Sequence, residues 1–102
     1  MNEINALKIG FKSYAIEKPE EISEVAGDYY GTACHQKEVI RIASRYSQHD
    51  KNHTFIHEML HCICMRFDLR ELNNDEHTIS LLATGIYEAI VDNPGCFLMA
   101  DV

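Results

Sequence analysis

The chain is poor in basic residues. Its 102 residues include nine Lys and Arg against sixteen Asp and Glu, which gives a formal net charge of −7. Binding to nucleic acid through the overall field of a protein needs clustered Lys and Arg, and so does adsorption to an anionic membrane surface. The charge balance therefore argues against both kinds of partner, and the length is that of one domain, residues 1–102.

Two further absences concern the compartment. No apolar run reaches the ~18–20 residues that cross a bilayer, and residues 1–8 lack the basic start and apolar stretch of a secretory signal. We therefore expect a cytoplasmic protein without a membrane partner. In that compartment we expect reduced thiols rather than disulfides at Cys34, Cys62, Cys64 and Cys96.

Repeats, low-complexity tracts and linkers are also missing, but the hydrophobic pattern changes once, near the middle. Residues 7–11 alternate apolar residues with lysine or glycine, as in a half-buried strand. Residues 22–28 are expected to form a short helical or irregular connection. Residues 29–34 and 39–43 then predict a hairpin that turns through 35–38. Together these segments predict about three antiparallel strands.

The second half of the chain has the helical period. Ser47 and Asp50 form a capping box at the start of a helix, because the hydroxyl is followed three residues later by a carboxylate. One apolar stripe then recurs at intervals of four, three and four residues. Its members are Ile56, Leu60, Ile63 and Phe67.

A polar loop is expected at residues 68–75, followed by a second helix that the sequence 93–95, Asn-Pro-Gly, brings to an end. The buried face of this second helix is predicted to consist of Ile79, Leu82, Ala83, Ile86 and Ile90. The fold class is therefore α+β, with a small antiparallel sheet followed by two helices.

Residues His57 to His61 have the form H-E-x-x-H and lie inside the first expected helix. Four residues advance a helix by ~400° and ~6 Å, so His57 and His61 project from nearly one face. Their ring nitrogens can then reach one metal ion at ~2.0–2.1 Å. Glu58 is rotated by ~100° from His57, which places it beside a metal-bound water as a proton acceptor rather than among the ligands.

A zinc site needs a third ligand from the protein. The extended pattern H-E-x-x-H-x-x-G-x-x-H would supply a histidine, but it needs Gly and His where this chain has Cys64 and Phe67. That class of zinc peptidase is excluded. The remaining candidates are the acidic residues and the histidine that follow the first helix, namely Glu71, Asp75, Glu76, His77, Glu88 and Asp92.

Helical phase favours Glu76 among these candidates. Ile79 and Ala83 follow it at i+3 and i+7, so Glu76 is expected on the buried stripe of the second helix. A bare carboxylate would be costly there unless it is paired or bound to a metal. His77 remains the main rival, because imidazole is a good zinc ligand, although it is rotated toward the flank.

Other residues with reactive side chains have simpler explanations. Cys62 and Cys64 flank the metal helix, but free cysteine is among the most buried residue types, so both are expected in the core. Cys34 and His35 are placed at the hairpin turn rather than at a metal site.

Two more histidines precede the motif. His49 and His53 are both expected to be solvated, and His53, one helical turn before His57, could line the mouth of a cleft. The sequence offers three tyrosines that could donate a hydrogen bond to an oxyanion and does not choose among them. They are Tyr29, Tyr30 and Tyr87.

Three features occur in one order along the chain: a hairpin over 31–42, the H-E-x-x-H helix, and a second helix that begins with an acidic residue. In this order they resemble the short phage- and prophage-encoded relatives of the ImmA/IrrE metallopeptidases, within the zincin superfamily. The second helix of those proteins has the pattern E-x-x-A-N-x-F-A, and its glutamate is the third metal ligand. Residues 76–83 match the pattern at its first and last positions and depart from it at Ile79 and Ser80.

The resemblance implies a minimal zincin-like metallopeptidase domain over residues 1–102. It further implies one zinc ion, held by His57, His61 and Glu76, with Glu58 as the general base. The substrate would be a protein or a peptide, and the setting a regulatory process of a phage or its bacterial host.

The alternative is a metal-stabilised binding module that acts through protein–protein contacts without peptidase activity. Glu58 separates the two hypotheses, because a purely structural zinc site does not need a glutamate at that position. Its presence favours the peptidase.

Overall fold

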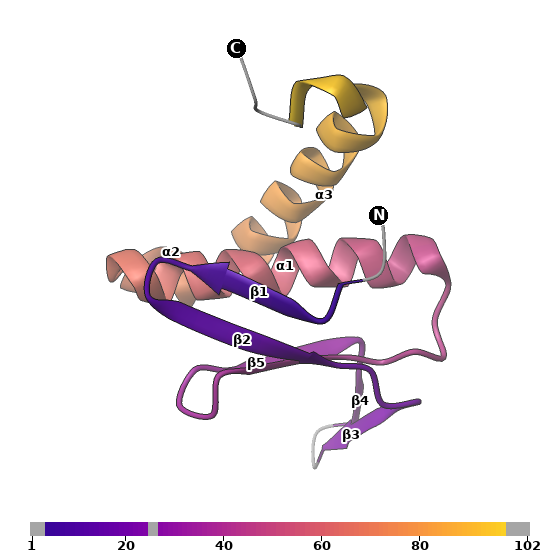
Figure 1. The fold of residues 1–102 in the computed structure, drawn as a ribbon, viewed down its shortest axis with the longest axis vertical. Helices are drawn as coiled ribbons and strands as arrows, with labels where there is room; N and C mark the ends of the chain where they lie inside the picture. Colours follow the sequence, from indigo (N-terminus) through magenta and orange to yellow (C-terminus); the bar gives the residue numbers. More distant parts are fainter. Residues whose placement is uncertain (1–3, 25–26, 98–102) are drawn as a thin grey trace.

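A computed structural model describes residues 4–24 and 27–97 of the chain (Figure 1). The strands are β1 (Ala6–Ile9), β2 (Lys12–Glu17), β3 (Ile22–Glu24), β4 (Gly27–Tyr29), β5 (Gly31–Cys34) and β6 (Val39–Ile42). The helices are α1 (Gln48–Phe67), α2 (Arg70–Asn73) and α3 (Glu76–Asp92), followed by a short 3-10 turn, η1 (Pro94–Phe97). The expected α+β class is confirmed.

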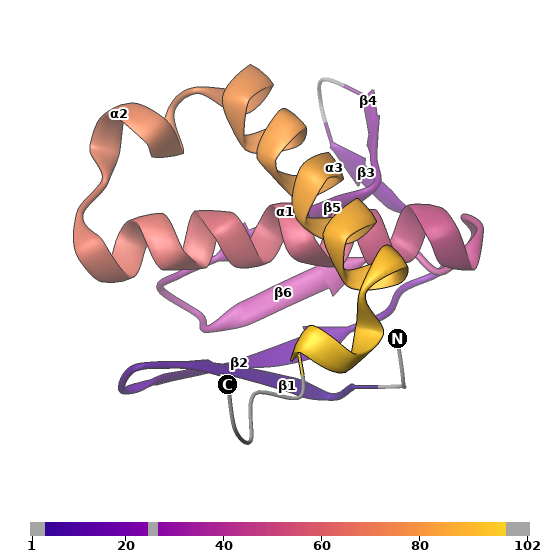
Figure 2. The ribbon, with the colours of Figure 1, turned by 90° about the horizontal axis from the view of Figure 1, so that it is seen from above.

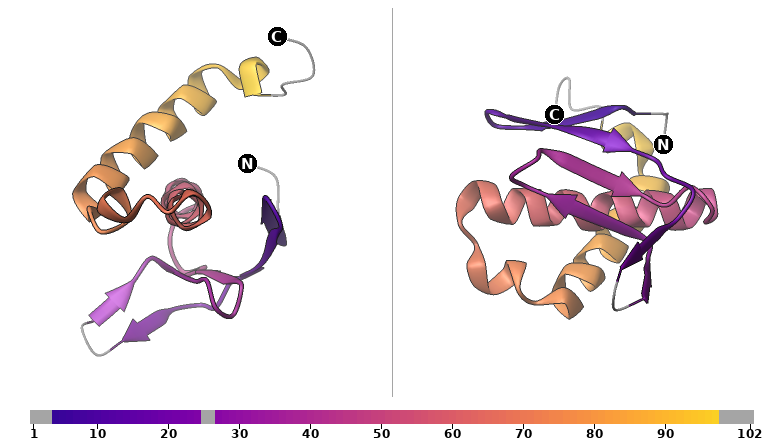
Figure 3. Two further views of the ribbon diagram at one scale, coloured as in Figure 1. Left: turned by 90° about the vertical axis from the view of Figure 1, so that its left-hand side faces the viewer. Right: turned by 90° about the horizontal axis from the view of Figure 1, so that it is seen from below.

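Three layers build the fold. The view along α1 in Figure 3 shows this helix between the sheet on one side and α3 on the other, and Figure 2 shows α3 crossing α1 obliquely. The largest fully buried side chains lie at the two contacts of α1, and they include Ile40 of the sheet, Ile56 and Cys62 of α1, and Ile79 of α3. The central helix α1 is therefore fixed in position by packing on both of its sides. Among the described residues, none of the helices has the length and apolar character that a bilayer crossing requires.

The main sheet has four strands in the order β1-β2-β6-β5, and it is mixed. The expected antiparallel sheet of about three strands is therefore wrong in both respects. The hairpin of β5 and β6 is present as predicted, but β6 inserts next to β2 and runs parallel to it, with Ile16 opposite Ile40. Pairing only neighbours along the chain cannot produce this arrangement. The chain must first cross to the far edge, at β5, before β6 returns to the centre.

The apolar alternation of residues 7–11 does not form one strand. Gly10 and Phe11 are the turn between β1 and β2, and Gly10 has a positive φ of 61°, which suits a tight hairpin turn. The Phe11 ring is 96% exposed rather than half-buried. It lies beside the guanidinium group of Arg66, whose Cζ is 5.8 Å from the ring centroid. A turn residue thus continued the alternating pattern by chance.

The expectation of a helical or irregular connection at residues 22–28 is wrong for the described residues, which form two strands. In the described part of it, β3 and β4 pair as a separate two-stranded ribbon, with Ile22 opposite Tyr29. Ile22 is 5% exposed, so this residue of the ribbon is buried. Likewise, the loop expected at 68–75 contains the single helical turn of α2.

Both long helices lie where the sequence predicts them. The Ser47 hydroxyl accepts a hydrogen bond from the Asp50 backbone N–H at 3.1 Å, and α3 ends directly before Asn93. Two predicted core residues are exposed instead. Phe67, at 63% exposure, lies at the last turn of α1, and Leu82, at 41%, lies on the flank of α3, whose buried stripe is narrow because it packs mainly on α1.

Candidate metal centre

A cleft of about 730 Å³ opens between β5 and the start of α3, with α1 as its floor. The H-E-x-x-H residues His57, Glu58 and His61 all line it, and Glu76 and Ser80 line it from α3. Strand β5 forms the other wall. The layered fold thus brings the motif helix, an edge of the sheet and the start of the second helix to one place.

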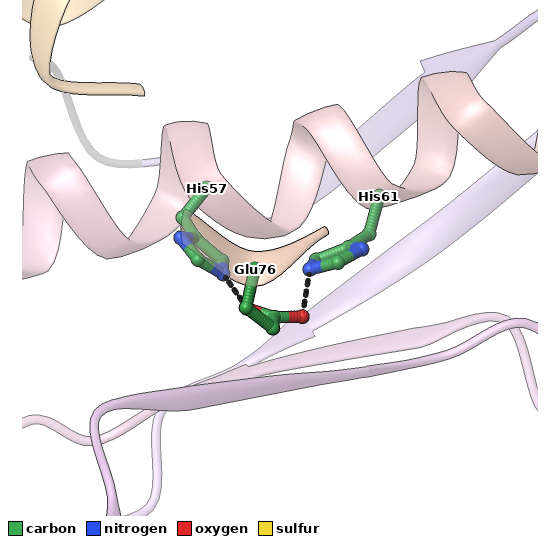
Figure 4. Close-up of side chains that lie close together, drawn as sticks. All are labelled: His57, His61 and Glu76. Carbon is green, nitrogen blue, oxygen red and sulfur yellow. Dashed lines mark hydrogen bonds and ion pairs between the residues drawn. The ribbon is translucent and has the colours of Figure 1, made fainter. Parts of the chain in front are cut away.

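Three side chains converge at the centre of this cleft (Figure 4). The two imidazoles project from the same face of α1, one turn apart, as the spacing predicts. One carboxylate oxygen of Glu76 lies 2.9 Å from Nε2 of His57, and the other lies 2.8 Å from Nε2 of His61. Within the described residues, this is the one group of three side chains that could hold a metal ion, with ligand atoms within 4.8 Å of one another.

Glu76 lies beside the two histidines, but not because it belongs to the buried stripe of α3, as was expected. Its side chain is 68% exposed, so it does not belong to the buried stripe of α3. It lies at the first residue of the helix and extends over the cleft from there. The neighbouring Asp75 caps the helix, because its carboxylate accepts hydrogen bonds from the Thr78 hydroxyl at 2.6 Å and from the Thr78 backbone N–H at 3.1 Å. These two bonds lower the pKa of Asp75.

The remaining third-ligand candidates stay apart from the two histidines. None of them belongs to the converging group in the described part of the chain. All five of them are exposed: Glu71, Asp75, His77, Glu88 and Asp92.

The surroundings of His61 fit a bound cation. Its Nδ1 lies 2.6 Å from the Asn73 side-chain oxygen, while its Nε2 faces the Glu76 carboxylate. Both partners are hydrogen-bond acceptors, whereas a neutral imidazole has a single N–H to donate. If Nδ1 donates its proton to Asn73, a metal ion between Nε2 and Glu76 satisfies the remaining lone pairs. This pattern, in which the far nitrogen of a ligand histidine donates to an oxygen, is usual at metal sites.

His57 has a similar but weaker arrangement. Its Nδ1 lies 3.4 Å from the Ser80 hydroxyl, which leaves Nε2 to face Glu76. Burial lowers the pKa of His57, and the Glu76 carboxylate opposes this effect. The ring is therefore neutral near pH 7, as a metal ligand must be.

The separations among these atoms are also suitable for a small ion. Ligand atoms of a tetrahedral zinc site lie about 3.4 Å apart when each bond is about 2.1 Å long. The Glu76 oxygens are within hydrogen-bond distance of both Nε2 atoms. A shift of a few tenths of an ångström by one exposed carboxylate makes room for the ion.

Glu58 lies in the same cleft but not in the converging group. Its side chain is 8% exposed, and its Cγ is 3.6 Å from the point where a Cβ on Gly31 of β5 would stand. Burial raises the pKa of Glu58 to about 7, with the nearby Glu76 adding to the rise and His61 opposing it. A carboxylate with such a pKa can take up and release a proton near neutral pH.

Several secondary predictions are confirmed. Cys62 and Cys64 are buried in the core, as expected. His53 lines the cleft, is partly exposed, and forms a hydrogen bond with the Thr84 hydroxyl at 2.9 Å. His49 is exposed, as expected. Cys34 is an exposed free thiol at the end of β5, and the side chain of Cys96 lies outside the described part of the chain.

The structure separates the three tyrosines. Tyr29 and Tyr30 line the cleft, whereas Tyr87 is buried against α1 and accepts a hydrogen bond from Asn52 at 3.3 Å. Only the first two are accessible to a molecule in the cleft.

The sequence did not place Asn73 or Ser80 at the site, and it assigned His35 to the hairpin turn rather than to the site. Ser80 follows Glu76 by four residues, so helical spacing could have placed both on one face. Asn73 depends on how the chain reverses between α1 and α3, for which the sequence has no local signal. His35 lines the cleft because β5 is the edge strand facing it.

Comparison with models of known protein families, with curated proteins and with solved structures finds no match in any of the three.

Proposed function

We propose that this protein is a zinc-dependent peptidase. The observation that carries the proposal is the position of the Glu76 carboxylate, 2.9 and 2.8 Å from the two Nε2 atoms of the H-E-x-x-H histidines. Two imidazoles and a carboxylate, with a fourth position left to water, are the ligands of a catalytic rather than a structural zinc site. The resemblance to the small ImmA/IrrE-like peptidases supports the same function.

In this proposal His57, His61 and Glu76 hold the ion. Bound there, zinc supplies Lewis acidity, which lowers the pKa of a water to about 7 and polarises a carbonyl group. Glu58 takes the proton from the attacking water and passes it to the leaving amine. Asn73 and Ser80 orient the two imidazoles through their Nδ1 atoms.

The substrate class follows from the wall of the cleft. In the described part of the chain, β5 is at one end of the sheet order, so one of its edges faces away from β6. Residues 31–33 of this strand line the cleft. An extended peptide can pair with the free backbone groups of such an edge, which brings a peptide bond past Glu58. A protein or peptide substrate is therefore favoured over a small metabolite.

The substitution Glu58→Gln tests the proposal. It keeps the shape of the side chain and removes a proton acceptor, while the metal ligands stay intact. Cleavage of denatured casein and of phage regulatory proteins should fall by at least ~10²–10⁴, the usual contribution of a general base. Zinc content, measured by mass spectrometry, should stay near one ion per chain. Unchanged cleavage by the variant would rule out this mechanism.

A binding module is the second candidate, and one surface favours it. Phe11 and Phe67 are exposed, and both rings lie near the guanidinium group of Arg66. Leu69, two residues after Phe67, is exposed as well. Exposed apolar groups of this kind are typical of protein–protein contacts. If the protein works by binding alone, Glu58→Gln should retain its full biological effect, whereas removal of Phe11 and Phe67 should abolish it.

A further inference from the structure

We propose that His35 donates a hydrogen bond from its Nε2 to an oxygen atom of the molecule that binds at the metal centre. The inference rests on the function proposed above and adds a substrate-binding residue from the β5 side of the cleft. His35 belongs neither to the H-E-x-x-H motif nor to the proposed metal ligands, so the function proposed above gives it no role. Its role follows from two contacts that fix its position and from a third that assigns the proton to one ring nitrogen.

The first anchor is the hydroxyl of Tyr14. This oxygen lies 3.2 Å from Nδ1 of His35, and the two rings are perpendicular, with centroids 5.9 Å apart. Tyr14 is 2% exposed and belongs to the core, so it cannot turn away. The second anchor is Lys12, whose ammonium group donates to the His35 backbone carbonyl at 2.9 Å. Ring and backbone of His35 are thus both held by strand β2.

The third contact, made by Tyr14, determines which ring nitrogen of His35 has the proton. The Tyr14 hydroxyl also lies near the thiol of Cys62, a residue of α1 that is 1% exposed. Sulfur is a weak acceptor, whereas an imidazole nitrogen is a good one. The Tyr14 hydroxyl therefore donates to Nδ1 of His35, and the thiol can donate to the Tyr14 oxygen. A neutral His35 with an acceptor at Nδ1 must have its proton on Nε2.

The position of His35 in the cleft is within electrostatic range of His61. The residue lines the same cleft as His57, His61 and Glu76. Burial lowers the pKa of His35, the positive charge of Lys12 adds to the effect, and so does His61. His35 is therefore neutral at pH 7.5, and its Nε2–H is the hydrogen-bond donor left for the cleft. An oxygen atom of a bound peptide, or of a hydroxamate, is the acceptor that suits it.

Acetohydroxamate is the probe that tests this role, because it binds zinc through two oxygen atoms. Its dissociation constant is measured by calorimetry at pH 7.5 on the zinc-loaded full chain. His35→Phe, which keeps a planar ring and removes the donor, should weaken binding about tenfold, the effect of one hydrogen bond. The matched control is His49→Phe, since His49 is exposed on α1 and does not line the cleft. It should bind the hydroxamate as the wild type does.

Two further measurements separate this role from a merely structural one. Nitrogen-15 NMR of the His35 ring should show the Nε2–H tautomer in the wild type, and Tyr14→Phe should shift the population toward the other tautomer. Tyr14→Phe should also weaken hydroxamate binding, with zinc content unchanged. If His35→Phe loses zinc, the hydroxamate affinity of Tyr14→Phe tests whether His35 donates the hydrogen bond.

Equal affinity of wild type and His35→Phe for the hydroxamate, at equal zinc content, would overturn the role of His35 and leave the metal centre standing. An Nδ1–H tautomer in the wild type would overturn it too. Failure of the wild-type protein to take up zinc would instead remove the proposed function on which the inference rests.

Discussion

The orientation of His61 depends on a residue outside the converging group of His57, His61 and Glu76. The Asn73 side-chain oxygen is 2.6 Å from Nδ1, and this contact turns Nε2 toward Glu76. Without it the ring can rotate, and either nitrogen can hold the proton. Partners of this kind raise the basicity of a ligand and fix its geometry. Asn73 should therefore contribute to zinc affinity although it is not itself a ligand.

We expect Asn73→Ala to weaken zinc binding by about 10–100-fold, the usual effect of losing a hydrogen-bond partner of a ligand histidine. The affinity can be measured by competition with a chromophoric chelator. Asn74→Ala is the matched control, because Asn74 is the exposed neighbour at the end of α2. Equal losses in the two variants would mean that the turn, not the contact with His61, sets the affinity.

The position of Glu58, buried in the lining of the cleft, has a cost in stability. Burial raises its pKa from 4.5 to about 7. Between these values the folded protein keeps a proton that the unfolded chain has released, so the stability of the metal-free protein falls as the pH rises. A shift of this size corresponds to ~3 kcal/mol. A bound cation would relieve the cost by attracting the ionised carboxylate.

Glu58→Gln should therefore stabilise the metal-free protein at pH 8, by up to ~3 kcal/mol, and have a much smaller effect at pH 5. The measurement is urea unfolding of both proteins in the presence of a chelator at the two pH values. The titrating histidines are common to wild type and variant, so the difference isolates Glu58. A difference that is the same at pH 5 and pH 8 would contradict the buried, shifted carboxylate.

At the scale of secondary structure, the close approach of β5 to α1 shapes the cleft. Gly31 makes this possible, because a Cβ there would lie 2.5 Å from the Thr54 methyl group and 2.8 Å from the Arg41 carbonyl oxygen. Both distances are shorter than van der Waals contact, and one partner is backbone. A side chain at this position would push the strand away from the helix that holds Glu58 and His57.

Gly31→Ala should accordingly destabilise the protein by ~1–3 kcal/mol, the usual cost of overpacking. Gly85→Ala in α3 is the control, since nothing lies within 4 Å of the position its Cβ would take. That variant should be neutral or up to ~1 kcal/mol more stable, because alanine favours a helix over glycine. Urea unfolding monitored by circular dichroism measures both, and a Gly31→Ala variant as stable as wild type would refute the tight contact.

Among the secondary-structure elements, the helices could be predicted from the sequence and the sheet only in part. The helix that contains H-E-x-x-H and the helix that starts at Glu76 were both predicted, because their signals are local: caps, a period of 3.6 residues, and Asn-Pro-Gly after the second helix. The sheet was predicted only in part. The turn at Gly10 and Phe11 continues the apolar alternation, and the parallel pairing of β2 with β6 joins segments that are far apart in the sequence.

The residues of the candidate site likewise fall into those that the sequence predicts and those that it does not. His57, Glu58 and His61 follow from spacing along one helix, and Glu76 was chosen correctly as the residue that meets the histidines, although on the wrong grounds, since it is exposed. Its role as a metal ligand stays a prediction. Asn73 could not be placed from the sequence, because its contact depends on the reversal of the chain.

For the molecule as a whole, the proposed metal centre lies where two layers meet. The two histidines belong to α1, and Glu76 is the first residue of α3. Farther along the same contact, Asn52 donates to the Tyr87 hydroxyl and His53 meets Thr84. An ion held by all three ligands therefore ties the second helix to the first, and its binding energy adds to the stability of the fold.

Zinc at a hundredfold excess over its dissociation constant should add ~2.7 kcal/mol to the stability of the folded protein. For a domain of about 100 residues this raises Tm by roughly 10–20 °C, which calorimetry with zinc or with a chelator measures. Glu76→Gln should lose most of the zinc-dependent rise, because it removes the ligand that joins α3 to α1. His77→Ala should keep it, because His77 is exposed and lies outside the converging group. The reverse result, with the rise kept by Glu76→Gln and lost by His77→Ala, would move the third ligand by one residue and change which face of α3 meets the metal.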